Sequence, residues 1–291
     1  MTSFWLPGME PPAPLTLEEK VDEAVEFLRK HEPPEGYLVG MSFGKDSIVT
    51  LDLVRLSGVK HEAWHSCTRI DPPEVYRFGR EHYPDVKWVY PKASLWDMIQ
   101  KKAPPLRMRR WCCDELKKFP TKKIPLVHRV MGVRAEESTR RASRERYEPM
   151  KSYGWMMYKP IFAWTEGDVW GYIESRRLPY PSIYDEGFSR VGCVWCPFLM
   201  ANNQARLILH MQRWPGVYKA FESATRRWWE TKGKSRGTLR EGAVPYADAE
   251  EFLANYYRGF DKPTRNYPEG SQKVRCLADA LALPRINLEV L

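Results

Sequence analysis

Short apolar segments alternate with amphipathic segments along most of the chain. Thr16 and Glu19 form a capping-box pattern ahead of an apolar repeat of helical spacing, which stops before Pro33. Residues 37–41 (YLVGM) are a short apolar run typical of a buried strand. Small polar residues follow this run and lead into a second helical repeat over residues 48–56. The pattern therefore predicts helix, strand, loop and helix in that order.

The same alternation continues downstream. Further strands are predicted at residues 59–66, 86–90, 126–133 and 159–162, with helices at 73–81 and 95–101. Strands that alternate with helices favour an α/β fold, here a doubly wound, mostly parallel five-stranded sheet with helices on both faces. Ligands of such sheets bind at the carboxyl ends of the strands.

The pattern becomes mainly helical after about residue 200, which divides the chain into three expected parts. Residues 1–34 form an N-terminal arm and helix, and residues 35–204 form the α/β domain. Residues 205–291 form a basic, Trp-rich helical extension, in which Trp214, Trp228 and Trp229 lie among arginines and lysines.

Charge and hydropathy narrow the class of protein. The 291 residues carry a formal net charge of +9, which favours anionic partners such as phosphates, nucleotides or nucleic acid. No apolar run reaches the ~18 residues that a membrane helix needs. The N-terminal residues lack the basic start and apolar core of a signal peptide. We therefore expect a cytoplasmic protein without membrane association.

The hexapeptide SFGKDS, residues 42–47, joins the first predicted strand to the helix after it. Gly44 allows the backbone to approach a ligand, and the N–H groups of the following helix point toward a bound anion. Ser42 and Ser47 supply hydroxyl donors, Lys45 a positive charge, and Asp46 either a helix cap or a ligand for Mg²⁺. The sequence is not a Walker A loop, so an ordinary strand-to-helix turn is the alternative.

Six cysteines are unevenly spaced. The adjacent pair Cys112 and Cys113 and the C-x-x-C pair Cys193 and Cys196 indicate metal binding in a reducing compartment. Their spacing suits either zinc or an iron–sulfur cluster. Cys67 is expected to pack in the core. Cys276 lies in the basic stretch KVRC, where it could be a reactive thiol.

Several segments resemble one known family. SFGKDS is similar to the S-G-G-x-D-S loop of the PP-loop ATP-pyrophosphatase (adenine nucleotide alpha hydrolase) superfamily, with Phe43 where glycine is usual. Four further segments resemble phosphoadenylyl-sulfate (PAPS/APS) reductases: TRIDPPE at 68–74, GVR with Glu137, Ser138 and Arg141 at 132–141, PI with WT and DVW at 160–170, and LPYPSIYDEGFSRVGCVWCP at 178–197. The resemblance covers about residues 35–200, so residues 35–204 are expected to be a PP-loop nucleotide-binding domain that carries the four paired cysteines.

The resemblance implies a set of roles. Bacterial adenylyl-sulfate reductases hold a [4Fe–4S] cluster with the same cysteine arrangement, which favours a cluster over zinc here. The nucleotide, ATP or adenylyl sulfate with Mg²⁺, is expected to bind residues 42–47, Thr68, Gly132 and Arg134. The expected catalytic residues are Lys45, Asp46, Arg134 and Lys117, of which Lys117 follows Cys113 by one helical turn and would neutralise cluster or substrate charge.

Three functions remain open. Sulfonucleotide reductases use a nucleophile in a C-terminal Cys-Gly-Ile/Leu-His tail, whereas this chain ends in ALPRINLEVL and continues Cys276 with Leu-Ala. We therefore favour ATP-dependent adenylation followed by sulfur transfer to tRNA or DNA, with reduction of the sulfonucleotide to sulfite as the alternative. A non-catalytic nucleotide- or nucleic-acid-binding module is the third possibility. A cysteine desulfurase or thioredoxin is the expected sulfur or electron donor.

Three clusters of basic residues stand out. The group after the fourth strand and the group before the cysteine pair are expected to clamp phosphate or sulfate, with a solvated charged face as the alternative. The third group mixes tryptophan with cations as nucleic-acid grooves do, with core tryptophan as the alternative. These groups are Arg134, Arg140, Arg141, Arg144 and Arg146; Lys101, Lys102, Arg107, Arg109 and Arg110; and residues 226–240.

Overall fold

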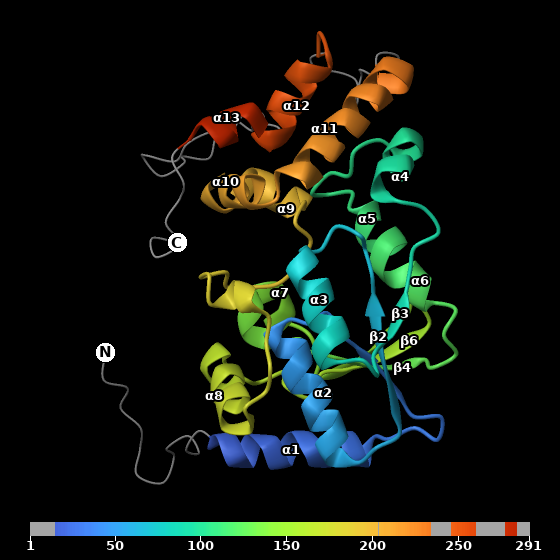
Figure 1. Ribbon diagram of the computed structural model, residues 1–291. Helices are drawn as coiled ribbons and strands as arrows, with labels where there is room; N and C mark the ends of the chain where they lie inside the picture. The colour runs from blue at the N-terminus through green and yellow to red at the C-terminus, as the bar shows by residue number, and fades with distance from the viewer. Residues whose placement is uncertain (1–14, 203, 234–245, 260–276, 284–291) are drawn as a thin grey trace, which may run out of the picture. The chain divides into compact units, whose positions relative to one another are not determined.

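The computed structural model describes residues 15–202, 204–233, 246–259 and 277–283 (Figure 1). The described chain forms two compact units. Of the described residues, the first unit contains 15–40, 45–63 and 126–179, and the second contains 41–44, 64–125 and the described residues from 180 onward. Most of the predicted N-terminal arm and Cys276 lie outside the described residues. The domain boundaries expected at residues 34 and 204 remain a prediction.

A six-stranded sheet has the order β3-β2-β1-β4-β6-β5. Strand β1 pairs in parallel with β4, β2 with β3, and β4 with β6, whereas β5 runs antiparallel to β6. The strands are β1 (Tyr37–Gly40), β2 (His61–Ser66), β3 (Lys87–Val89), β4 (His128–Met131), β5 (Tyr147–Met150) and β6 (Trp155–Tyr158).

Helices α1, α2 and α8 of the first unit lie against one another (Figure 1). The predicted capping box of α1 is present: Thr16 N donates to Glu19 Oε2 at 2.7 Å, and Glu19 N donates to Thr16 Oγ1 at 3.3 Å. A second capping box, between Thr165 and Asp168, starts α8. The helices of this unit are α1 (Leu17–Lys30), α2 (Lys45–Ser57), α7 (Thr139–Ala142) and α8 (Glu166–Arg176).

The second unit carries most of the remaining helices. Helix α11 packs against α4, α10 and α12, and aromatic side chains fill the space between them. The ring of Trp195 stacks on Phe221 at 4.2 Å between centroids. The described helices of this unit are α3 (Pro73–His82), α4 (Leu95–Lys102), α5 (Trp111–Cys113), the π-helix Asp114–Lys118, α6 (Phe119–Thr121), the 3-10 helix Ser182–Tyr184, α9 (Pro197–Asn202), α10 (Gln204–Arg213), α11 (Pro215–Trp228), the π-helix Trp229–Gly233, α12 (Ala249–Tyr257) and α13 (Leu277–Ala282).

The predicted fold class is confirmed as an α/β fold with a mostly parallel sheet and a mainly helical C-terminal region. Two details differ. The sheet has six strands rather than five, and the strand expected at 159–162 lies earlier, at β6, because the apolar run Trp155–Tyr158 pairs on both sides. Strand β5 was not predicted because it contains Pro149, which strands tolerate at a sheet edge.

The prediction that tryptophans of the C-terminal region bind nucleic acid is wrong for the described residues. Trp214, Trp228 and Trp229 are buried, with 7%, 5% and 2% of their surface exposed. They therefore belong to the helical core and present no open ring face for a base. Lys234, Arg236 and Arg240 lie outside the described residues. No helix in the described part of the chain is both long enough and apolar enough to cross a membrane.

Gly132 lets the segment after β4 pass close to the first turn of α2. A Cβ at this position would lie 2.5 Å from the carbonyl oxygen of Asp46 and 2.9 Å from the backbone nitrogen of Ser47. Both atoms belong to the backbone, so neither can rotate out of the way. Only glycine allows this approach without displacing α2 or the loop.

We predict that Gly132→Ala lowers the free energy of unfolding by about 1–3 kcal/mol, because an added methyl group must move backbone atoms. Urea denaturation measures this change. Gly167→Ala in α8 is the control, since its Cβ would have ordinary contact at 3.7 Å from Thr165 Oγ1 and alanine favours helix. Equal stability of the two variants would contradict the proposed steric role of Gly132.

Candidate functional site

The loop of residues 42–47 connects β1 to α2, as the sequence predicts. Helix α2 begins at Lys45, so the backbone N–H groups of its first turn face the end of the loop. Within the loop, Gly44 N donates to Ser42 Oγ at 3.4 Å. Strands β1 and β4 are parallel neighbours, and the chain leaves them for opposite sides of the sheet order. This is the switch point at which open α/β sheets bind ligands.

Phe43 keeps the backbone form that glycine would favour at this position of the loop. Its φ is 58°, in the left-handed region. The strain is offset by burial, because the side chain is fully buried and its ring lies 4.6 Å from the His65 ring and 5.5 Å from Trp88. A Cβ on Gly79 would lie 2.5 Å from this ring. Phe43 can therefore offer only its backbone to a ligand.

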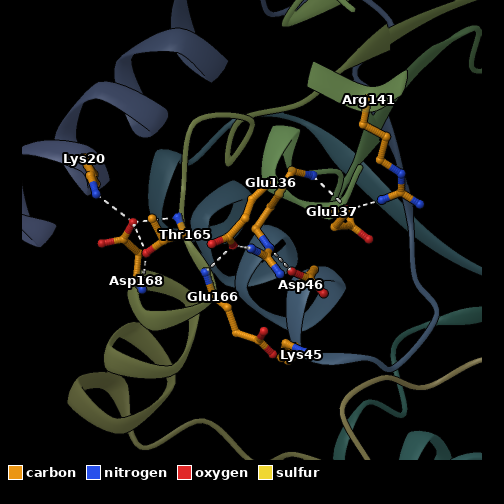
Figure 2. A network of polar contacts seen from close by, with 10 residues as sticks. Lys20, Lys45, Asp46, Glu136, Glu137, Arg141, Thr165, Glu166 and Asp168 are labelled. Atoms are coloured by element: carbon orange, nitrogen blue, oxygen red, sulfur yellow. Dashed lines mark hydrogen bonds and ion pairs between the residues drawn. The ribbon is translucent and has the colours of Figure 1, made fainter. Parts of the chain in front are cut away.

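Asp46 and Arg134 join α2 to the loop after β4. Arg134 Nε donates to Asp46 Oδ1 at 2.5 Å, and Arg134 Nη1 pairs with Glu136. The backbone N of Arg134 donates to Glu137 Oε2 at 3.0 Å, and Glu137 also pairs with Arg141 (Figure 2). Arg134 is buried, with only 4% of its surface exposed. The carboxylates raise its pKa even though burial alone would lower it.

Lys45 is paired with a carboxylate that the sequence did not single out. Its Nζ lies 2.8 Å from Glu166 Oε1, and Figure 2 shows the Glu166 side chain directed at Lys45. The hydrogen bond from Lys45 lowers the pKa of Glu166. Lys45 also lies 5.8 Å from the ring centre of Trp170, one turn further along α8. Glu166 N donates to Glu136 Oε2 at 2.7 Å, which links this pair to the Arg134 group.

The arginines after β4 are also engaged with carboxylates of the first unit. Arg144 Nε lies 2.8 Å from Glu148 Oε1, and Arg146 pairs with Glu23. Arg134, Arg141, Arg144 and Arg146, which belong to the clamp expected for phosphate or sulfate, are therefore paired with the protein's own acidic side chains. An anionic ligand would have to compete with them.

The four paired cysteines come together in the second unit. The Cys112 thiol donates a hydrogen bond to Cys113, which lowers the pKa of Cys113 to about 6 and raises that of Cys112. The charges of Cys193 and Cys196 also act on Cys112. Burial raises the pKa of Cys193 to about 12 and also raises that of Cys196. Val194 N, between the last two cysteines, donates to Ile70 O at 2.7 Å and anchors this segment.

Lys117 and Asp71 adjoin the cysteines. The charge of Cys193 raises the pKa of Lys117, and Lys117 Nζ lies 3.8 Å from Asp71 Oδ1. Asp71 Oδ2 accepts from Thr68 Oγ1 at 2.7 Å and from the Tyr76 hydroxyl at 3.2 Å. Burial alone would raise the pKa of Asp71, but Lys117 and Thr68 outweigh it and hold the pKa below 3.8. The Thr68 hydroxyl is thus committed to Asp71.

The structure gathers the predicted site residues into two groups. Lys45, Asp46, Ser47, Gly132 and Arg134 belong to the first unit. Ser42, Phe43, Gly44, Thr68, Lys117 and the four cysteines belong to the second unit. Within the described ranges, no group of three or more His, Cys, Asp or Glu side chains is spaced to hold a metal ion.

Sequence reasoning missed Glu136, Glu166 and Asp71. Glu166 opens α8 directly after the N-cap Thr165, where an acidic residue is usual for helix-dipole reasons. Because an acidic residue is usual at this position, the contact of Glu166 with Lys45 could not be predicted from the sequence. Asp71 lies within the segment TRIDPPE, whose resemblance to the family assigns no role to the carboxylate.

We predict that Asp71→Asn lowers the free energy of unfolding at pH 7 by about 1–3 kcal/mol. The loss is smaller than that for breaking a fully buried ion pair, because the Lys117 side chain is 41% exposed. The depressed pKa of Asp71 stabilises the fold above about pH 4, and this contribution is lost as the pH falls through the folded pKa. The variant should therefore lose less stability than the wild type between pH 5 and pH 2, measured by urea denaturation.

Asp114→Asn is the control for this prediction. Its exposed pair with Lys118, four residues later on the same helix, should contribute less than about 0.5 kcal/mol. Parallel pH profiles for the Asp71 variant and the wild type would contradict the assignment.

The sequence of the chain is similar to a known protein family and to several known proteins. The model of the phosphoadenosine phosphosulfate reductase domain matches residues 36–198. The chain is 26% identical over 217 residues to an uncharacterized protein of Methanocaldococcus jannaschii, covering 70% of this chain and 44% of that protein. It is 29% identical over 188 residues to an adenosine 5'-phosphosulfate reductase of Geobacillus sp. (strain WCH70), covering 60% of this chain and 77% of that enzyme.

Solved structures were also compared. The phosphoadenylyl-sulfate reductase of Candida auris, in a phosphate complex, has a TM-score of 0.48 at 20% identity and covers 62% of this chain and 96% of that one. The FMN adenylyltransferase of Candida glabrata, in complex with FAD and pyrophosphate, has a TM-score of 0.46 at 13% identity, over 61% of this chain and 63% of that one. Because the family model spans more than half of the sequence, the chain belongs to the phosphoadenosine phosphosulfate reductase domain family.

Proposed function

We propose that this protein binds ATP at the loop of residues 42–47 and adenylates an acceptor, which then receives sulfur. The observation that carries nucleotide binding is the group formed by Lys45, Asp46 and Arg134 at the carboxyl ends of the parallel strands β1 and β4. Cations and helix N–H groups at this position suit a polyphosphate. Family membership supports an enzyme of nucleotide chemistry.

The proposed reaction has two steps. An acceptor oxygen attacks the α-phosphorus of ATP, and pyrophosphate leaves; a sulfur species then displaces AMP from the acceptor. Lys45 and Arg134 stabilise charge on the phosphates, and Asp46 with Mg²⁺ orients them. The proposed nucleotide contacts within the first unit are the hydroxyl of Ser47 and the backbone at Gly132. Contacts from Ser42, Phe43, Gly44 and Thr68 remain predictions from the sequence, and the Thr68 hydroxyl already donates to Asp71.

The distribution of thiols favours adenylation over reduction. A reductase that attacks sulfur needs a nucleophilic thiol besides the four paired cysteines. Among the described residues, the remaining cysteine is Cys67, which is buried with 6% of its surface exposed. Reduction of adenylyl sulfate to sulfite remains the second candidate, because several relatives are named adenosine 5'-phosphosulfate reductases.

We propose that Cys112, Cys113, Cys193 and Cys196 hold a [4Fe–4S] cluster, with zinc as the alternative. Four thiols that already influence one another's pKa form a donor set of the right chemistry. They would have to approach more closely to share an ion, since no described group has metal-binding spacing. A bound cluster would supply an iron site for a sulfur species, and Lys117 would balance its negative charge.

A basic turn in the second unit supports a nucleic-acid acceptor, tRNA or DNA. Leu106 and Arg109 exchange two backbone hydrogen bonds, at 3.3 and 3.0 Å, which puts Arg107 and Met108 at the tip. Met108 is 94% exposed. The guanidinium of Arg110 lies 4.1 Å from the ring centre of Phe198, which is itself 38% exposed. An exposed ring with cations beside it suits stacked bases and a phosphate backbone.

The remaining partners follow from this chemistry. A cysteine desulfurase would supply sulfur for transfer, whereas a thioredoxin would supply electrons for the reductase alternative. The cytoplasmic location expected from the sequence stays a prediction.

We predict that anaerobically purified protein releases pyrophosphate from labelled ATP, and that added tRNA or single-stranded DNA increases the rate. The double variant Arg110→Gln, Phe198→Ala should raise the KM for the nucleic acid by about tenfold, because one stacked base contributes about 1–3 kcal/mol. Pyrophosphate release is followed by thin-layer chromatography.

Lys122→Gln is the matched control, since it removes an exposed charge of the same unit outside the turn. Sulfite release from adenylyl sulfate and a thiol, without pyrophosphate from ATP, would support the reductase instead. Tight nucleotide binding with neither product would support a non-catalytic module.

We also predict a broad absorption band at about 400 nm in the anaerobic protein, which bleaches on reduction. Cys193→Ser should remove the band together with bound iron and sulfide. Cys67→Ser should retain both, because Cys67 lies outside the four-cysteine set. Colourless protein with stoichiometric zinc would contradict the cluster and favour zinc.

A further inference from the structure

The cations of the proposed phosphate site are already neutralised by carboxylates of the same unit. Lys45 pairs with Glu166, and Arg134 pairs with Asp46 and Glu136. Two cations therefore face three carboxylates, so this group carries a net negative charge at neutral pH. A polyphosphate is repelled here until a carboxylate moves or a cation accompanies the ligand.

The three carboxylates differ in how easily they can leave. Asp46 is part of α2, and its side chain is only 23% exposed. The Glu136 side chain is 51% exposed, but its carboxylate makes two contacts, with Arg134 Nη1 and with Glu166 N. Glu166 lies at the first position of α8, its side chain is 50% exposed, and its carboxylate bonds to Lys45 and to Trp170 but not to Arg134. It can therefore turn into solvent without unpairing Arg134.

Lys45 cannot make the same move. Its side chain is 4% exposed, so its ammonium group lies away from bulk water beside Trp170 and Glu166. A buried ammonium group is stabilised by an anionic partner. A ligand phosphate at this position would replace the negative charge of Glu166 when that carboxylate turns away.

We propose that Glu166 stands in for a nucleotide phosphate at Lys45, so that nucleotide binding displaces the carboxylate and pyrophosphate departure restores it. Glu166 is thus a positioning residue that keeps the loop ordered without ligand and weakens the hold on product. It also selects among nucleotides, because only a ligand that carries phosphate charge at this point can replace the carboxylate. This inference rests on the proposed nucleotide function and deepens it.

The test is the affinity of Glu166→Gln for MgATP and for magnesium pyrophosphate, measured by isothermal titration calorimetry. Removing one negative charge near the phosphates should tighten both by about fivefold, as expected for a charge about 5 Å away in a watery site. In turnover, the KM for ATP should fall and kcat should fall with it, because pyrophosphate leaves more slowly. A purely structural loss would lower kcat without tightening either ligand.

Lys20→Met is the matched control. Lys20 pairs with Asp168 at 2.6 Å, so this variant removes another ion pair at the start of α8 without touching Lys45 or α2 (Figure 2). Its ligand affinities should equal those of the wild type. Glu166→Ser is the second variant, and it should show the same tightening if Glu166→Gln folds poorly.

The outcomes separate the two proposals. Wild-type binding of MgATP without tightening in either Glu166 variant, or with weaker binding, overturns the role of Glu166 and leaves the nucleotide function standing. Failure of the wild type and both Glu166 variants to bind MgATP overturns the nucleotide function and this inference together. Equal tightening in Lys20→Met also overturns the inference, since it would trace the effect to a loosened α8.

Discussion

The ion pair between Asp46 and Arg134 holds the first turn of α2 to the loop after β4, and the rest of the site is arranged around it. Arg134 is almost fully buried, so it needs carboxylate partners, and Glu136 completes its pairing. Glu136 in turn accepts from the first N–H of α8. Gly132 makes the approach possible, because any side chain there would meet the backbone of Asp46 and Ser47.

Charge at this site is local and differs from the charge of the whole molecule. The chain carries a net charge of +9, yet each described cation next to the start of α2 is matched by a carboxylate. An anionic ligand at the start of α2 would therefore have to exchange with these carboxylates, whatever the attraction exerted by the net charge of the chain.

In the second unit, aromatic packing and a charge pair position the loop residue Phe43 and the cysteines. Phe43 stays in a left-handed conformation because its ring completes an aromatic cluster with His65 and Trp88. In the same unit, the buried Asp71 and the partly exposed Lys117 form a charge pair beside the cysteines. The thiols are thereby held among charges of both signs, which is a suitable setting for a thiolate-bound metal.

Periodicity by itself determined the first strand, the loop and the helices α1 and α2, because burial of one face imposes a regular spacing. It also located most of the parallel strands and the residues of the loop. It did not predict β5, because Pro149 is unusual in a strand, and it did not predict that Trp228 and Trp229 are buried. The contact of Lys45 with Glu166 was decided by the tertiary structure alone. Ion pairs between distant segments leave no period in the sequence, and only the packing of α8 against α2 brings their side chains together.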